Sequence, residues 1–178
     1  MLKKFIPSYH AKNLYDVDML FFKKKDIKLV LCDLDNTLDA YNVFEPSKKA
    51  IDLVNNFKNN GINFMIISNN HGKRVRKYAS LLGVNCLFSA RKPFAYKVKK
   101  MLKQMKMDLN NVIIIGDQTV TDIACANRAK IKSLLTDKLV EIDQPTTRFN
   151  RFFDKKIRKR LKKAGKLKDW RCALYEWD

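Results

Sequence analysis

Two aspartates separated by a single residue, Asp33 and Asp35, come directly after a short apolar run at residues 29–32. In an extended chain, residues i and i+2 point to the same side, so both carboxylates can reach one site. One carboxylate could attack phosphorus, while the other protonates the departing oxygen and later activates water. Two close carboxylates repel each other, and a divalent cation relieves that repulsion. On its own, such a pair is more often part of a solvated loop after a strand.

Two further polar groups come later in the chain. Ser68 and Asn69 follow the apolar run at residues 64–67 and offer a hydroxyl and turn amides for phosphoryl oxygens. Lys92 precedes Pro93 at the expected start of a helix, where it could supply a positive charge. Taken singly, the first group is an ordinary turn after a strand and the lysine is an ordinary surface residue.

The fourth group is the segment GDQTVTD at residues 116–122, which follows the apolar run at 112–115. Asp117 is placed to bind a hard cation through oxygen. Asp122 lies in the first turns of the next helix, where it could support the metal, orient Lys92 or interact with the helix dipole. Hydrolysis of a phosphate monoester needs a nucleophile, a proton donor and cations over the phosphoryl oxygens. The four groups, in this order and at expected strand ends, predict one such site.

The elements that must position these residues alternate between apolar and amphipathic segments from residue 28 to residue 134. Short apolar runs of this kind are typical of buried parallel strands, with functional residues at their carboxyl ends. The alternation predicts an α/β fold, a three-layer α/β/α sandwich with a central parallel sheet. Strands are expected at 29–32, 64–67, 112–115 and 131–135, and helices at 47–59, 73–82, 94–106 and 119–128.

Two flanks do not follow the alternation. Residues 1–26 are rich in aromatic and aliphatic side chains and are expected to pack as a helix or an extended arm. Residues 145–178 form a basic C-terminal extension that includes the cationic tract 155–163. Helical spacing in this extension predicts one apolar face, made of Phe153, Ile157, Leu161 and Ala164, on an otherwise cationic helix.

The composition limits the class of protein. A chain of 178 residues that is 46% hydrophobic predicts a single domain over 1–178, with its core at about 28–137, and excludes a disordered protein.

The four cysteines are far apart, which argues against a zinc site or a disulfide scaffold. No apolar run could span a bilayer and the N-terminus does not resemble a secretory signal, so we expect a cytoplasmic protein. The net charge of +19 favours polyanionic partners.

The sequence DLDNT at residues 33–37, followed by Ser68, Lys92 and GDQTVTD, resembles the haloacid dehalogenase (HAD) superfamily of phosphatases. The resemblance covers roughly residues 28–137 and implies a Rossmann-like fold with Mg²⁺ as the cofactor. Because the ligands are all oxygen atoms, Mn²⁺ could replace Mg²⁺. The resemblance implies that Asp33 is the nucleophile and Asp35 the general acid/base. It also implies metal ligation by Asp33, Asp35 and Asp117, support from Asp122, and phosphate binding by Thr37, Ser68, Asn69 and Lys92.

The gaps between the motif residues leave no room for a cap domain, which is similar to subclass IIIA of the superfamily. An open site suits a phosphate that is presented on a lipid surface, a nucleic acid or a protein. The start at 1–7, the motifs above and the segment at 145–151 look like the YqeG family, which is similar to phosphatidylglycerophosphate phosphatases. This resemblance implies dephosphorylation of phosphatidylglycerophosphate to phosphatidylglycerol.

Several functions remain open from the residues alone. The cationic tract would favour peripheral binding to the anionic inner face of the membrane, although an apolar stripe is also typical of core packing. A nucleic-acid end phosphatase is a rival, because Phe149, Phe152 and Phe153 lie among Arg148, Arg151 and Lys155 and could stack bases. A phosphatase for small sugar phosphates is another rival. From a different class, the chain could be a non-catalytic basic adaptor for RNA or membrane, and the oligomeric state stays undetermined.

Overall fold

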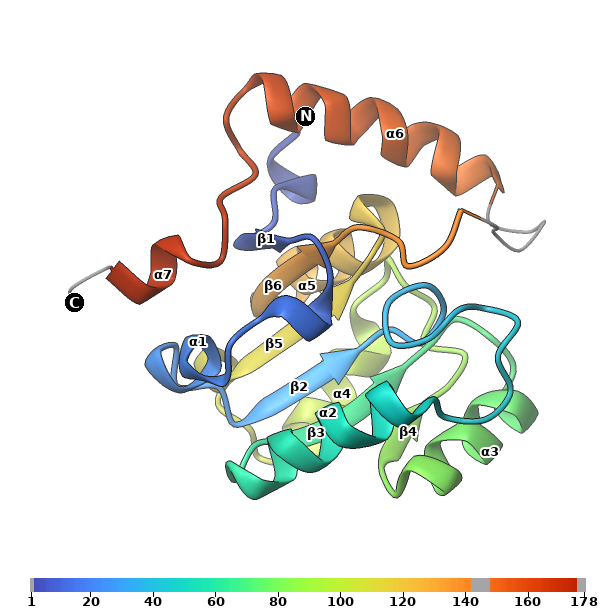
Figure 1. Ribbon diagram of the computed structural model, residues 1–178. Coiled ribbons are helices and arrows are strands. Elements are labelled where there is room, and N and C mark those ends of the chain that lie inside the picture. Colours follow the sequence, from blue (N-terminus) through green and yellow to red (C-terminus); the bar gives the residue numbers. More distant parts are fainter. Residues whose placement is uncertain (1, 142–147, 176–178) are drawn as a thin grey trace.

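The computed structural model describes residues 2–141 and 148–175, and within them six parallel strands form one sheet in the order β1-β6-β5-β2-β3-β4 (Figure 1). The strands are β1 (Tyr9–Ala11), β2 (Leu29–Cys32), β3 (Asn63–Ile67), β4 (Asn85–Leu87), β5 (Val112–Gly116) and β6 (Lys132–Thr136). The α-helices are α1 (Met19–Lys24), α2 (Lys48–Asn59), α3 (Gly72–Leu82), α4 (Tyr96–Gln104), α5 (Ala124–Ala129), α6 (Arg148–Lys163) and α7 (Cys172–Tyr175). Three short 3-10 helices, η1 (Leu2–Phe5), η2 (Leu14–Asp16) and η3 (Leu109–Asn111), and a π-helical turn, η4 (Thr119–Ile123), complete the elements.

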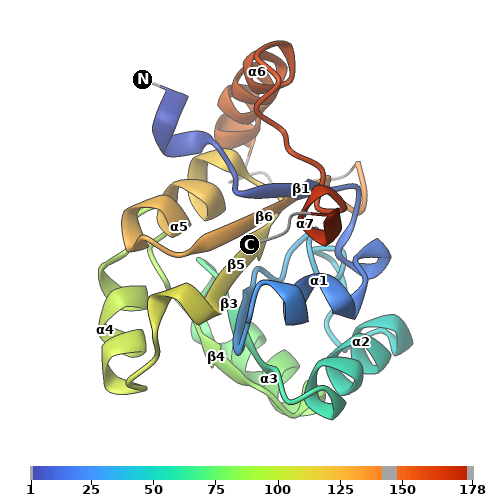
Figure 2. The same ribbon diagram turned by 90° about the vertical axis from the view of Figure 1, so that its left-hand side faces the viewer.

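Helices cover both faces of the sheet, which confirms the predicted three-layer sandwich. Side chains alternate along a strand, so Val30 and Leu31 of β2 belong to opposite cores. The first core contains side chains of α1, α2, α3 and α7, including the fully buried Phe57. The second core contains side chains of α4 and α5, including Val98. Figure 2 shows α4 and α5 on one side of the sheet and α1, α2 and α7 on the other.

The ends of the predicted helices follow local chemistry. Ser47 accepts a hydrogen bond from the backbone N–H of Ala50 and thereby caps the start of α2. Gly83 ends α3 with a left-handed φ of 66°, a conformation that glycine adopts without steric penalty. The predicted helix at 119–128 is interrupted, because its first turn is the π-helical η4 and only the remainder is α-helical.

The sequence analysis missed two strands, both at edges of the sheet. β1 lies in the flank 1–26, where a helix or an extended arm was expected, and it pairs with β6. β4 pairs with β3 at the opposite edge. The flank also contains α1, whose Phe21 and Phe22 are fully buried in the first core. Residues 2–25 are therefore an integral part of the sandwich.

The basic C-terminal extension does contain the predicted helix, α6, which lies beyond the β1 edge of the sheet (Figures 1 and 2). The predicted apolar face is wrong in part: Leu161 is fully buried, but Phe153 and Ala164 are exposed. The charged Asp154 is buried instead. Within the described ranges, no helix combines the length and the apolar character needed to cross a membrane. The segment 145–147 and the side chains of residues 148 and 149 lie outside the described residues.

Candidate active site

The predicted site residues meet at the carboxyl ends of three neighbouring strands. Asp33 follows β2, Ser68 follows β3 and Asp117 follows β5, with β2 between the other two. After β2, the next strands β3 and β4 are added on one side of β2, and the later strands β5 and β6 are added on its other side. Such a reversal leaves a crevice at the strand ends, where α/β proteins bind their ligands.

The centre of the site is a cluster of three buried carboxylates, Asp33, Asp117 and Asp122. One oxygen of each lies within 4.8 Å of the others, and their exposed fractions are 8%, 0% and 1%. Gly116 makes this approach possible, because a Cβ at that position would lie 2.3 Å from Cγ of Asp122. Position 116 therefore requires glycine, because the side chain of Asp122 packs directly against its Cα.

Lys92 is the main counter-charge of this cluster. Its Nζ donates hydrogen bonds of 2.6 Å to both Asp33 Oδ1 and Asp122 Oδ1, and one of 3.2 Å to the carbonyl oxygen of Ile67. Burial by itself lowers the pKa of Lys92, but the carboxylates of Asp122 and Asp33 outweigh burial and raise it. Lys92 therefore stays charged. Of the three roles predicted for Asp122, this contact corresponds to the orientation of Lys92.

Burial shifts the protonation of Asp33 and Asp117, although each has a cationic partner: Lys92 pairs with Asp33, and Arg151 pairs with Asp117. Burial raises the pKa of Asp33 well above its usual value, and it raises the pKa of Asp117 to about 6, with the Asp122 carboxylate adding to the increase. Asp117 Oδ1 is buried and has no hydrogen-bond partner among the described residues. A buried carboxylate oxygen without a hydrogen-bond partner, beside two further buried carboxylates, fits a hard divalent cation, which prefers oxygen ligands. The residues present thus fit Mg²⁺ or Mn²⁺.

Asp35 is held at the wall of the site by residues that the sequence analysis did not identify. Its two carboxylate oxygens accept hydrogen bonds from Asn70 Nδ2 at 2.6 Å and from Arg74 Nη1 at 2.7 Å. Burial raises the pKa of Asp35, and Arg74 opposes that increase. Arg74 also binds the carbonyl oxygens of Tyr41 and Val43, so it links the Asp35 loop to α3.

The three other predicted phosphate-binding side chains differ in where they lie. Ser68 lines the active-site pocket, and its Oγ accepts a hydrogen bond from the N–H of Asn70. Asn69 also lines the pocket, but its amide donates to the carbonyl oxygen of Lys92 and accepts from the N–H of Lys92. Asn69 therefore holds the lysine backbone in place. Thr37 is buried, and its Oγ1 has no hydrogen-bond partner among the described residues.

The pocket itself is small. Its volume is about 70 Å³, which suits a phosphoryl group with a few waters rather than an entire substrate. Of the predicted site residues, the pocket is lined by Asp33, Asp35, Ser68, Asn69 and Lys92, together with Asn36, Tyr41, Asn70, Gln118, Thr121, Asn150 and Arg151. Two of these, Asn150 and Arg151, belong to α6, so this helix forms part of the pocket wall.

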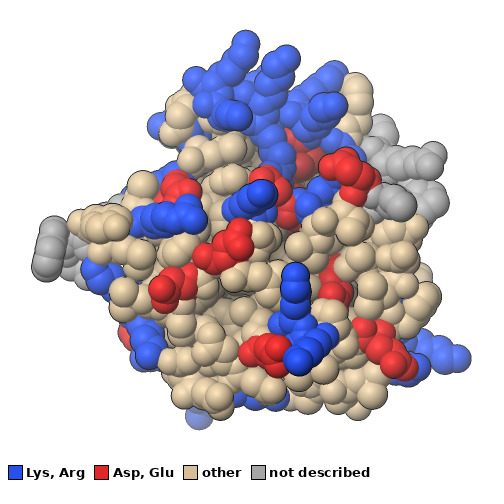
Figure 3. Space-filling model, in the orientation of Figure 1, with Lys and Arg blue, Asp and Glu red and all other residues tan. Residues whose placement is uncertain are grey.

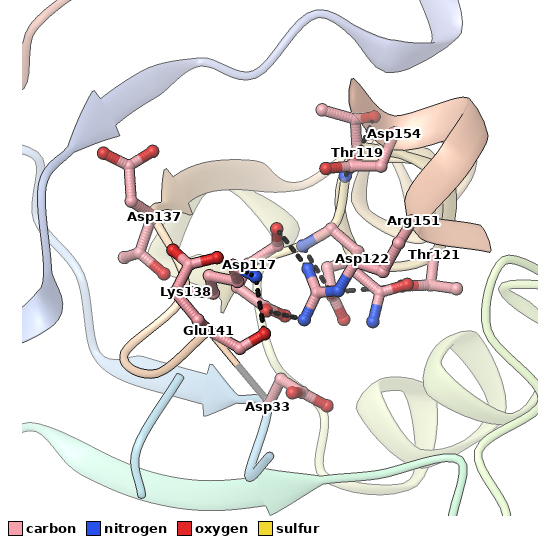
Figure 4. A network of polar contacts seen from close by, with 12 residues as sticks. Asp33, Asp117, Thr119, Thr121, Asp122, Asp137, Lys138, Glu141, Arg151 and Asp154 are labelled. Carbon is pink, nitrogen blue, oxygen red and sulfur yellow. Dashed lines mark hydrogen bonds and ion pairs between the residues drawn. The ribbon is translucent and has the colours of Figure 1, made fainter. Parts of the chain in front are cut away.

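Helix α6 also holds the loop that carries Asp117 (Figure 4). Asp154 accepts hydrogen bonds from the backbone N–H and the Oγ1 of Thr119, at 2.5 and 2.6 Å, and so caps η4 from another helix. Arg158 binds Asp154 at 2.8 Å and donates to the carbonyl oxygens of Asp117 and Thr136. The sequence analysis expected this helix to have one apolar face and to be cationic elsewhere, and it did not identify Asp154. The signal in the sequence was a single acidic residue within a basic helix.

Asp154→Ala is expected to reduce the free energy of unfolding by about 3 kcal/mol, because it removes the cap of η4 and one carboxylate partner of Arg158. Asp154→Asn, which keeps one acceptor oxygen for Thr119, should lose less. Urea denaturation followed by circular dichroism measures both changes. The neighbouring exposed Lys155→Ala is the matched control, with an expected change within about 0.5 kcal/mol. A loss for Asp154→Ala as small as that of the control would show that the cap contributes nothing.

Comparison with known proteins agrees with this geometry. The family described as haloacid dehalogenase-like hydrolase matches residues 2–136. The chain is 31% identical over 166 residues to the probable phosphatase YqeG of Bacillus subtilis, covering 93% of this chain and 96% of that one. It is 26% identical over 151 residues to the chloroplastic/mitochondrial phosphatidylglycerophosphate phosphatase 1 of Arabidopsis thaliana, covering 79% of this chain but only 43% of that protein.

A solved structure shares the fold. The cobalt-bound deoxy-D-mannose-octulosonate 8-phosphate phosphatase of Haemophilus influenzae superposes with a TM-score of 0.50 at 16% identity, covering 65% of this chain and 81% of that one. The predicted resemblance is confirmed, since the family match covers most of the chain and the B. subtilis relative matches along nearly its full length. The chain belongs to the haloacid dehalogenase-like hydrolase family.

Proposed function

We propose that this protein is a Mg²⁺-dependent phosphomonoester hydrolase that forms a phospho-aspartate on Asp33 and acts on phosphatidylglycerophosphate. The observation that carries the proposal is the buried cluster of Asp33, Asp117 and Asp122 around Lys92, at the carboxyl ends of β2 and β5. Four charged groups are rarely buried together unless they serve a site that needs them. A non-catalytic adaptor has no use for such a cluster.

Each residue has a defined part in the reaction. A carboxylate oxygen of Asp33 attacks phosphorus, and the bond from phosphorus to the substrate alcohol breaks. Asp35 gives its proton to the departing alcohol oxygen. Asp35 then takes a proton from water, which attacks the phosphorus of the phospho-aspartate and releases inorganic phosphate and free Asp33. Lys92 and the Ser68 hydroxyl hold the phosphoryl oxygens during both steps.

The cation would be held by the carboxylates of Asp33 and Asp117 and by the backbone carbonyl of Asp35. When bound, Mg²⁺ neutralises charge on the phosphoryl oxygens and on the carboxylates around them. The buried unpartnered Oδ1 of Asp117 supports this assignment. Asn69 would contribute by fixing the backbone of Lys92, and Asp122 by orienting its side chain. Thr37 would offer its hydroxyl to the phosphoryl group.

Two observations support a lipid substrate and an anionic membrane surface as partner. The Arabidopsis relative is itself named a phosphatidylglycerophosphate phosphatase. In addition, Lys and Arg side chains gather over α6 at the edge of the molecule (Figure 3). Phe152 and Phe153 of α6 are exposed by 57% and 44% beside these cations. A helix with exposed aromatic and basic side chains is suited to the interface of an anionic bilayer.

The substrate is tested by measuring phosphate release from phosphatidylglycerophosphate in anionic mixed micelles, with and without Mg²⁺. Oligonucleotides with terminal phosphates and small sugar phosphates are measured beside it. The expected result is a Mg²⁺-dependent preference for the lipid. Preference for an oligonucleotide end would keep the mechanism and replace the substrate. Inactivity on every compound would favour the adaptor function.

Asp35→Asn should distinguish substrates by their leaving group. With an alkyl phosphate, we expect the rate to fall by about 10²–10⁴-fold, because the departing alkoxide needs a proton. With p-nitrophenyl phosphate, whose leaving group departs as a stable anion, the first turnover should be affected far less. Rapid-mixing measurement of p-nitrophenolate release isolates that first step. An equal loss for both substrates would contradict the role of Asp35 as the acid, and the exposed Asp52→Asn on α2 is the control.

A further inference from the structure

We propose that Arg151 and the divalent cation compete for the negative charge of the Asp117 carboxylate, with Arg151 paired to Asp117 Oδ2 in the metal-free protein. The inference rests on the proposed function, because it concerns the same cation site. It assigns a role to a residue of α6 that no catalytic motif contains. It also makes the position of the Arg151 side chain on α6 respond to the metal.

The contact is direct and buried. Arg151 Nη2 lies 2.5 Å from Asp117 Oδ2, and its Nη1 lies 3.5 Å from the carbonyl oxygen of Asp117. The two side chains are exposed by only 17% and 0%. Figure 4 shows the guanidinium of Arg151 pointing from α6 into the site, toward Asp117 and the neighbouring carboxylates.

The charges of the cluster explain why an arginine is there. Lys92 makes ion pairs with Asp33 and Asp122, whereas Arg151 makes the ion pair with Asp117. A buried carboxylate without a partner is strongly unfavourable, so the metal-free site needs a cation at Asp117. Arg151 provides that charge from α6.

A divalent cation on Asp117 removes the need for Arg151 and opposes its presence. The guanidinium and the metal ion would share one carboxylate in a buried site, where repulsion between like charges is strong. Binding of one therefore weakens binding of the other, and by linkage the effect is reciprocal. The metal must displace Arg151 from Asp117 before it gains the full charge of that carboxylate.

Arg151 has room to move while α6 stays in place. The helix is held by Asp154, Arg158 and the fully buried Leu161, none of which depends on Arg151. Arg151 lines both the active-site pocket and a second cavity of about 500 Å³ between α6 and the segment after β6. That cavity is also lined by Asp137 and Glu141, whose carboxylates already pair with Arg158 and Lys138 and would add the displaced guanidinium to these ion pairs.

Isothermal titration calorimetry of the metal-free protein with Mg²⁺ tests the competition without any substrate. Arg151→Gln should bind Mg²⁺ about tenfold more tightly than the wild type, a coupling of ordinary size between two ligands of one site. The control is Lys155→Gln, which removes a positive charge from α6 at an exposed position lining the same second cavity. Its affinity for Mg²⁺ should stay within about twofold of the wild type.

Every outcome decides the inference. Unchanged affinity in Arg151→Gln overturns it, and weaker affinity overturns it by showing that Arg151 positions Asp117 for the metal. If neither protein binds Mg²⁺, the cation site of the proposed function fails as well, which separates the two conclusions. A second measurement needs no Arg151→Gln protein: the Nε–H resonance of Arg151, assigned with Arg151→Lys, should shift when Mg²⁺ is added to the wild type. An unmoved resonance at saturating Mg²⁺ would contradict displacement.

Discussion

Replacing Asp33 with asparagine is expected to lower phosphate release by about 10⁴-fold or more, because an amide cannot serve as the nucleophile for phosphorus. The substitution keeps the shape of the side chain and removes one of the three buried carboxylates at the strand ends. The remaining pair of Lys92 and Asp122 balances in charge, so the fold should be retained. Phosphate release from phosphatidylglycerophosphate under saturating Mg²⁺ is the measurement.

The matched control for this substitution is Asp52→Asn, which makes the same chemical change at an exposed position of α2. Its activity should equal that of the wild type. Circular dichroism of both variants confirms that the fold is present. An Asp33→Asn protein with wild-type activity would exclude a phospho-aspartate at this position. Retained binding of the substrate with loss of turnover would separate catalysis from binding.

Lys92→Met should have the largest effect on stability. Lys92 is the shared ion-pair partner of Asp33 and Asp122, and its side chain is only 2% exposed. Methionine preserves most of the side-chain volume but leaves two buried carboxylates facing each other without a cation. Removal of one partner from a buried ion pair lowers the free energy of unfolding by about 3–5 kcal/mol. Urea denaturation of the metal-free protein measures the loss, and we expect phosphate release to be lost as well.

Lys99→Met tests whether this loss is specific to the buried site, because it makes the same change at an exposed position of α4 and should alter stability by less than about 0.5 kcal/mol. The double variant Lys92→Met/Asp122→Asn should recover part of the stability, since one of the opposed charges is gone. If the double variant were less stable than Lys92→Met, repulsion between the carboxylates would not be the cause. Equal losses in Lys92→Met and Lys99→Met would contradict the buried ion pair itself.

The central part of the fold could be predicted from the sequence because its strands are buried on both sides. β2 and β5 consist of uninterrupted apolar residues, and their burial leaves no ambiguity about where they run. The edge strands β1 and β4 could not be recognised, since each has three residues and includes polar side chains. Their pairing depends on the neighbouring strand, which the local sequence does not describe.

The same distinction applies to the candidate site. Asp33, Ser68 and Asp117 could be predicted because each follows a strand, and parallel strands bring their carboxyl ends together. Arg74 and Arg151 could not, because they come from helices whose orientation relative to the sheet is set by tertiary packing. In a chain with 37 lysines and arginines, nothing in the sequence distinguishes these two from surface cations.

The cap that Asp154 places on η4 has a consequence for the order in which the protein is made. Synthesis proceeds from the N-terminus, so every motif residue from Asp33 to Asp122 is added to the chain before Asp154. At that stage the backbone N–H of Thr119 lacks its acceptor, Asp154, and the carbonyl oxygen of Asp117 lacks its donor, Arg158. A nascent chain can therefore fold its sheet first and complete the loop that carries Asp117 only when residues 148–163 have emerged.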